Sequence, residues 1–184
     1  PYFDIPFQHI SDKILKSMKR YSDSQKIKDF IKNLKAQLPE CFLRTNLIIW
    51  FPWETDEDFD MLKNFVKENE FDNISIFQFH DEKFADSFNI LPKVDEKTIN
   101  QRFVEIKKIV DDKIKISKKR LEWKEILWYI ENIYQNRKWE TKLVVRPEIC
   151  APEMDFTHNI DLEQILDTFG KDEIDIWDKI IYQS

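Results

Sequence analysis

The chain has 184 residues, of which 42% are hydrophobic and 35% are charged, and its net charge is −6. This composition predicts a globular protein with enough apolar residues to form a core. The negative balance argues mildly against a general nucleic-acid binder, because such proteins usually carry an excess of basic residues.

The cysteines and the lengths of the apolar runs indicate in which compartment we expect the protein. The two cysteines, Cys41 and Cys150, are far apart and form no C-x-x-C pair, so their spacing predicts neither a zinc nor an iron–sulfur site and no disulfide framework. No apolar run approaches the ~20 residues of a membrane helix, and no signal peptide is recognisable. We expect a cytoplasmic protein without a membrane partner and, because the sequence starts at Pro1, a fragment of a longer chain.

Strands and helices alternate in the first 80 residues. The pattern predicts a short strand, a helix capped by Ser11, a second helix ended by a proline, a strand, a helix capped near Thr55 and a third strand. Their expected ranges are 2–7, 12–20, 24–38, 42–49, 55–70 and 74–79. Such alternation is typical of a parallel sheet covered by helices, so the expected class is α/β.

The second part of the chain has a different pattern. A loop at 81–93 precedes one long amphipathic helix over 95–121, whose apolar residues recur every three or four positions. Four β-like segments then follow, at 125–133, 138–146, 162–169 and 173–182. Short strands in such succession predict a small OB-like β-barrel. We place a domain boundary near residue 122, which gives domains 1–121 and 122–184.

Polar residues near the ends of the first and second predicted strands are candidates for a ligand site. Gln8 follows the first strand, where polar side chains of a barrel face the ligand. Asn46 interrupts an apolar strand and shares a face with Arg44, so it needs a partner on a neighbouring strand or on a ligand. His9 is more often structural, and Glu54 at a helix start is more often a capping residue.

Ser11 and Arg20 each have a structural alternative as well. Ser11 is equally well explained as a helix cap, and Arg20 at a helix end suits the helix dipole. Taken alone, these residues predict only half of an α/β barrel, with a small-molecule site at its strand ends, followed by a small β-barrel.

Three segments resemble signatures of one enzyme family. PYFDIPFQHISDKILKSMKR (1–20) is similar to Y-x-D-x-P-x-QH-x-SD-x-x-L-x-x-M-x-R, and LRTNLIIWFPWETDEDF (43–59) to LRT-x-x-I-x-GFPGET-x-x-DF. EICAPEMD (148–155) is similar to an APE-x-D element. The radical-SAM methylthiotransferases carry these signatures in this order. The Gln8-His9 pair and residues 43–45 resemble the ribosomal-protein branch (RimO type) more than the tRNA branch (MiaB type).

The resemblance implies a fold and an activity. The fold would be the C-terminal half of a radical-SAM TIM-like partial barrel, followed by a TRAM domain. In this family, S-adenosylmethionine on a reduced [4Fe–4S] cluster gives a radical that removes a β-hydrogen from an aspartate of a small-subunit ribosomal protein, and a methylthio group is installed there. The TRAM-like part would bind that basic protein, with tRNA the less favoured partner.

The resemblance also implies roles for individual residues in binding S-adenosylmethionine. Gln8 would contact the ribose, with Ser11 nearby, and Arg20 would hold the carboxylate. Asn46 would lie beside the nucleoside, and Ile48 would flank the adenine.

Two departures from the family pattern stand out. The three-cysteine cluster motif is absent and is expected upstream, so the fragment alone should be inactive; a non-catalytic binding module is the alternative. In addition, the chain has a single glycine. Tryptophan stands at family glycine positions 50, 53 and 123, and Tyr21, Phe156 and Asp178 fall on others. One hypothesis is that some of these tryptophan codons are UGA translated as glycine; genuine sequence drift is the other.

Overall fold

A computed structural model describes residues 1–21, 23–80, 95–121, 125–152, 155, 157–163, 165, 175–176 and 178–183. The chain forms two compact units, Pro1–Lys119 and Arg120–Ser184. The loop expected at 81–93, as well as Trp123 and Phe156, lies outside the described residues. Within the described part, no helix combines the length and the apolar character needed to cross a membrane.

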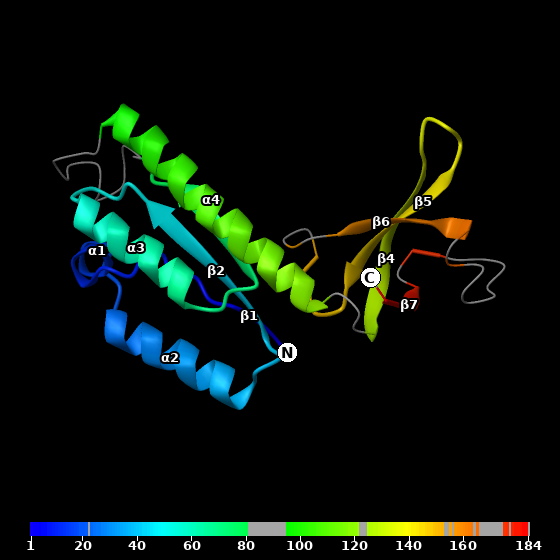
Figure 1. The fold of residues 1–184 in the computed structure, drawn as a ribbon, viewed down its shortest axis with the longest axis horizontal. Coiled ribbons are helices and arrows are strands. Elements are labelled where there is room, and N and C mark those ends of the chain that lie inside the picture. The colour runs from blue at the N-terminus through cyan, green and yellow to red at the C-terminus, as the bar shows by residue number, and fades with distance from the viewer. Residues whose placement is uncertain are drawn as a thin grey trace. The chain divides into compact units, whose positions relative to one another are not determined.

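The first unit is a three-stranded parallel sheet with helices. Its strands pair in the order β1-β2-β3, and helices connect them (Figure 1). This confirms the predicted α/β class and the parallel sheet. The elements are β1 (Tyr2–Asp4), α1 (Asp12–Ser17), α2 (Ser24–Gln37), β2 (Phe42–Ile49), α3 (Asp56–Glu68), β3 (Asn73–Gln78) and α4 (Glu96–Leu121).

Strand β1 and helix α1 end three residues before their predicted limits. Strand β1 ends at Asp4, and α1 ends at Ser17 instead of near Arg20. The helix stops because Lys19 adopts a left-handed conformation, with φ 57°. The Lys19 amide then donates to Lys16 O (3.0 Å) and the Arg20 amide to Leu15 O (2.9 Å). This pair of hydrogen bonds is the Schellman arrangement that closes many helix C-termini.

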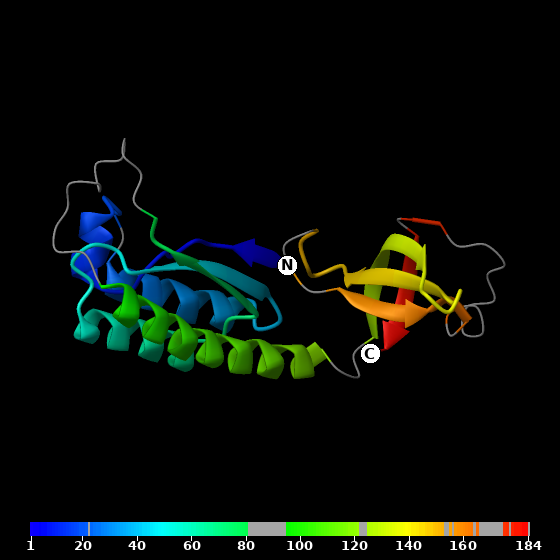
Figure 2. The ribbon, with the colours of Figure 1, turned by 90° about the horizontal axis from the view of Figure 1, so that it is seen from above.

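Strand β2 separates an apolar face from a more polar one. Its odd-numbered residues Leu43, Leu47 and Ile49 are fully buried and pack with apolar side chains of α2, α3 and α4. Figure 2 shows these three helices along one side of the sheet. Because side chains alternate along a strand, Asn46 and Ile48 face the other side, where they are only half-buried.

The second unit is a four-stranded antiparallel sheet with the order β6-β5-β4-β7. It has its own apolar core, which includes Trp128, Ile130, Leu143 and Val145. The strands are β4 (Glu125–Gln135), β5 (Thr141–Pro147), β6 (His158–Asp161) and β7 (Lys179–Gln183). Within the described residues, neither sheet closes on itself. The second unit is therefore an open sheet where a small β-barrel was expected, whereas the first unit was expected to be only half of a barrel.

Two strand predictions in this unit were wrong. The strand expected at 162–169 lies earlier, at His158–Asp161, and residues 162, 163 and 165 are helical. Leu162 and Ile165 are three positions apart, which places both on one side of a helical turn. The strand expected at 173–182 is confined to β7, because Asp175 and Asp178 form a turn: the Asp178 amide donates to Asp175 O (3.1 Å).

Five non-glycine residues in the described part have positive φ, and three of them are tryptophans. The angles are 70° at Gln8, 57° at Lys19, 68° at Trp50, 70° at Trp53 and 63° at Trp139. A Cβ atom costs roughly 1–2 kcal/mol in this conformation, which is why glycine usually occupies it.

Trp139 ends the three-residue loop 137–139, which the pair Asn136 and Glu140 closes in the hairpin of β4 and β5. The Asn136 amide donates to Glu140 O, and the Trp139 amide donates to Asn136 O, each at 3.0 Å. Loops of this length commonly end on a left-handed residue, for which glycine is the usual choice. The indole of Trp139 is 82% exposed and therefore has little packing to offset the backbone strain.

We expect Trp139→Gly to raise the free energy of unfolding by about 1 kcal/mol, because it relieves the left-handed strain and removes little burial. Trp139→Ala is the matched control, since it removes the indole but keeps Cβ. Urea denaturation of the two variants measures the difference. A Trp139→Ala variant as stable as Trp139→Gly would contradict the left-handed conformation.

Candidate functional site

The end of β2 and the segment that follows β1 lie side by side. The Gln8 amide donates to Asn46 O (2.8 Å), and the Ile48 amide donates to Gln8 O (2.7 Å). These bonds form an isolated parallel bridge between Gln8 and Leu47. Three of the predicted ligand residues, Gln8, Asn46 and Ile48, are therefore neighbours in space. Ligand sites of parallel sheets lie at this carboxyl end of the strands.

This group of residues combines polar and apolar surface. Asn46 Oδ1 is buried and has no hydrogen-bond partner among the described residues. Ile48 pairs in register with Phe77 of β3, which is 52% exposed, and the two residues offer apolar surface beside the amide. A buried acceptor without a partner next to an apolar surface fits a ligand that has both hydrogen-bond donors and a flat ring, such as a nucleoside.

The contacts of Arg44 indicate a structural role. Its guanidinium is buried and donates to Asp4 Oδ2 (2.6 Å) and to Ser75 Oγ (2.8 Å). These contacts join all three strands across the face that also carries Asn46. Arg44 thus holds β1 and β3 against β2 near the start of β2.

Ser11 and Arg20 lie apart from the group formed by Gln8, Asn46 and Ile48. Ser11 occupies the N-cap position of α1, yet its hydroxyl makes no capping bond and instead donates to Asp58 Oδ1 (2.6 Å). Arg20 is exposed and lines a cavity of about 400 Å³ with Phe7, Ile27 and other residues of α1, α2 and the segment after β1. In the described residues, neither side chain hydrogen bonds to Gln8 or Asn46.

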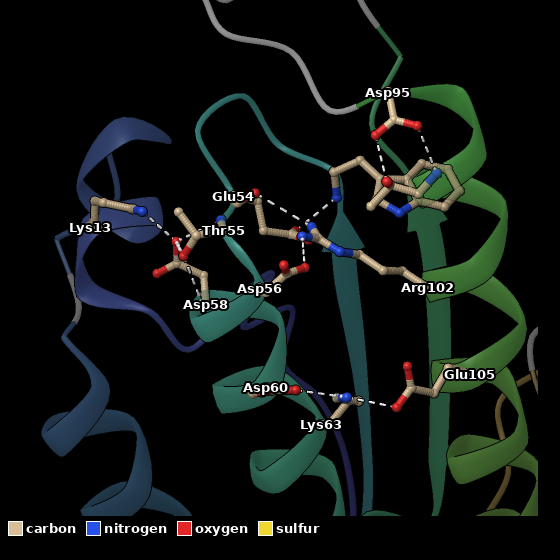
Figure 3. Close-up of polar contacts among 12 residues, drawn as sticks. Lys13, Glu54, Thr55, Asp56, Asp58, Asp60, Lys63, Asp95, Arg102 and Glu105 are labelled. Carbon is tan, nitrogen blue, oxygen red and sulfur yellow. Dashed lines mark hydrogen bonds and ion pairs between the residues drawn. The ribbon is translucent and has the colours of Figure 1, made fainter.

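A buried carboxylate fixes the turn that follows β2. Glu54 Oε2 accepts from the Trp50 amide (2.8 Å), and Glu54 Oε1 accepts from Arg102 Nη1 of α4 (2.6 Å). Arg102 also contacts Asp56 (2.7 Å), as Figure 3 shows. His9 Nε2 lies 3.6 Å from Glu54 Oε2. Glu54 therefore connects the segments after β1 and β2 with α4, and it is not the helix cap that the sequence suggested.

Thr55 caps α3, as predicted, through a reciprocal capping box with Asp58. Asp58 accepts from the Thr55 amide (2.9 Å) and from Lys13 Nζ (Figure 3). It also accepts from Ser11 Oγ. Burial by itself raises the pKa of Asp58, but the hydrogen bonds from Lys13, Ser11 and Thr55 outweigh it and hold the pKa well below its ordinary value.

Sequence reasoning missed the roles of His9, Asp58 and Arg102. A signal was present for Arg102, because it falls between Ile99 and Ile106 at the spacing of the apolar stripe of α4. An arginine on a buried helix face requires a partner, and that partner is Glu54. Asp58 carried a weaker signal as the third residue of a helix capped by threonine.

No group of three or more His, Cys, Asp or Glu side chains in the described part of the chain is placed to hold a metal ion. Both cysteines are buried, and they belong to different units. The donor set of the described residues therefore does not fit a [4Fe–4S] cluster.

We expect Asp58→Asn to lower the free energy of unfolding at pH 7 by about 1–3 kcal/mol, because charge-assisted hydrogen bonds are lost. The lowered folded-state pKa implies that this stabilisation is complete above the unfolded pKa of about 4 and disappears as the pH falls further. Denaturation of both proteins from pH 7 to pH 2 tests this. A stability gap that stays constant with pH would contradict it.

We expect Arg102→Met to destabilise the chain by about 3 kcal/mol, because it leaves the buried Glu54 carboxylate without its cation. The double variant Glu54→Gln/Arg102→Met should lose less than the sum of the two single losses. Lys107→Met, on an exposed part of α4, is the control. Additive losses in the double-mutant cycle would show that the two side chains do not interact.

Comparison with curated proteins finds relatives that carry the same name, whereas no protein-family model matches the chain. The chain is 36% identical over 154 residues to "Ribosomal protein uS12 methylthiotransferase RimO" of Myxococcus xanthus, covering 84% of this chain and 32% of that protein. The RimO of Natranaerobius thermophilus is 38% identical over 154 residues (84% and 34%). That of Alkaliphilus oremlandii is 34% identical over 171 residues (91% and 38%).

The chain spans about a third of the length of these relatives. Over most of its own length, the chain is homologous to the RimO methylthiotransferases.

Proposed function

We propose that this chain is the C-terminal part of a RimO-type radical-SAM methylthiotransferase that modifies the β-carbon of an aspartate in ribosomal protein uS12. Residues 1–121 would form the second half of the radical-SAM barrel, and residues 122–184 a TRAM-like β-barrel. The observation that carries the proposal is the meeting of Gln8, Asn46 and Ile48 at the strand ends of a RimO homologue.

In such an enzyme, S-adenosylmethionine bound to a [4Fe–4S] cluster supplies the radical chemistry. The residues of this chain bind and orient the nucleoside. Asn46 Oδ1, buried and without a partner in the described residues, accepts a hydrogen bond from it. Gln8 contacts ribose hydroxyls, and Ile48 packs against the adenine. Preorganised contacts of this kind hold the reacting group at one position.

The other two predicted ligand residues have different support. Ser11 acts indirectly, because its bond to Asp58 holds the segment after β1 against α3. Arg20 as the partner of the ligand carboxylate rests on the family resemblance alone. The exposed position of Arg20 leaves its long side chain accessible to an anion.

The cluster ligands would come from a segment of the full-length protein outside this chain. That assignment follows from two observations: the described residues contain no suitable donor group, and the chain matches only a third of its relatives. On this account the 184-residue chain alone does not catalyse the reaction.

Charge distribution favours a basic protein over tRNA as the partner of the second unit. Residues 120–184 contain 8 Lys and Arg against 14 Asp and Glu, whereas residues 1–119 contain 21 of each. The second unit therefore carries the entire net charge of −6. An acidic unit attracts a basic ribosomal protein and repels a phosphate backbone.

The function is tested with the complete gene product, purified anaerobically with its cluster and incubated with S-adenosylmethionine and a sulfur source. Purified uS12 and tRNA are offered separately, and mass spectrometry follows both. We expect a methylthio group on an aspartate of uS12. Modification of tRNA alone would support the MiaB-type alternative, and modification of neither would support a non-catalytic binding module.

Within that protein, Asn46→Ala should weaken S-adenosylmethionine binding about tenfold, the equivalent of one hydrogen bond to a buried acceptor. Asn33→Ala, an exposed asparagine of α2, is the matched control. Isothermal titration measures both. Equal affinities of the two variants for S-adenosylmethionine would show that Asn46 does not belong to the binding site.

A further inference from the structure

The tryptophans of the chain fall into two kinds. Four of the six lie in the described residues, and three of these, Trp50, Trp53 and Trp139, have φ between 63° and 70°. The fourth, Trp128, lies in β4 with 1% of its side chain exposed, and its ring meets that of His158 edge-on at 5.3 Å. Of these four tryptophans, Trp128 alone combines an ordinary strand backbone with a site that packs an indole.

The turn after β2 has hydrogen bonds that involve its backbone and the Glu54 carboxylate. Its hydrogen bonds join the Trp50 amide to Glu54 Oε2 and the Glu54 amide to Phe51 O (3.0 Å). Arg102 then fixes Glu54 from α4. A glycine at position 50 or 53 would keep every one of these contacts and would adopt the required φ without strain.

The indole at position 50 is poorly accommodated. Its ring is buried and lies 6.1 Å from that of Phe103, yet its Nε1 is buried without a hydrogen-bond partner in the described residues. A buried indole N–H normally has a partner. The indole at position 53 is 45% exposed, and that at 139 is 82% exposed, so neither is well packed.

The composition of the chain also indicates that glycine is missing from positions that need it. The chain has one glycine in 184 residues, whereas about 7% is usual. Of the other replacements at family glycine positions, Tyr21 is described and does not have positive φ. Among these positions, the left-handed conformation is found at Trp50 and Trp53.

We infer that positions 50, 53 and 139 are glycine in the protein as its organism makes it, because the codon at these positions is UGA and is translated there as glycine. Trp128 is a genuine tryptophan with a different codon. The turn that follows Ile48 would carry no indole, and a ligand could approach its backbone closely.

Peptide mass spectrometry of the protein isolated from its own organism tests this inference. Trypsin releases residues 45–63, which contain positions 50 and 53, and residues 125–137, which contain Trp128. We expect the first peptide to be lighter by two tryptophan-to-glycine replacements and the second to have its tryptophan mass. The gene should carry UGA at 50, 53 and 139 and UGG at 128. Tryptophan at 50 and 53 in the native peptide overturns the inference.

A stability series on the 184-residue chain provides a second test that does not depend on translation. Glycine and alanine variants are made at positions 50 and 53, with Trp128 as the control. If the left-handed backbone determines which residue is more stable at positions 50 and 53, the glycine variants have the higher urea midpoint there. At position 128, the alanine variant has the higher midpoint. Alanine more stable than glycine at both 50 and 53 contradicts a position built for glycine.

Discussion

The buried carboxylate of Glu54 is the contact on which the candidate site depends. It accepts a hydrogen bond from the backbone at position 50 and an ion-pair bond from Arg102, so it ties the turn after β2 to α4. His9, in the segment that follows β1, lies against the same carboxylate. The strand ends that carry Gln8, Asn46 and Ile48 are thereby held at fixed positions. A site that orients a ligand requires this kind of rigid support.

A second acidic residue extends this support to α1 and α3. Asp58 receives hydrogen bonds from Ser11, Lys13 and Thr55, and its lowered pKa keeps it charged at neutral pH. At the opposite end of the sheet, Asp72 accepts from the Leu43 amide and from Ser117 of α4. Acidic side chains thus anchor both ends of the parallel sheet. The carboxyl end also presents a buried acceptor, Asn46 Oδ1, that lacks a partner in the described residues.

Local sequence rules predicted most of the first unit. The apolar run that Asn46 interrupts predicted the range of β2, and Thr55 marked the start of α3. Side-chain pairs between distant segments could not be predicted, because Glu54 and Arg102 are 48 positions apart and either residue alone suits a surface. In the second unit, Leu162 and Ile165 fit a strand or a helix in so short a segment, and tertiary packing decided between them.

The central claim is that the ends of β1 and β2 bind the nucleoside of S-adenosylmethionine. Photo-crosslinking of the full-length protein with an azidoadenosyl analogue of S-adenosylmethionine, followed by peptide mapping, tests it most directly. We predict that the label attaches within residues 45–63, which include the end of β2, and that unlabelled S-adenosylmethionine competes it away. The claim would be contradicted if the label attached only within residues 120–184 and unlabelled S-adenosylmethionine still competed it away.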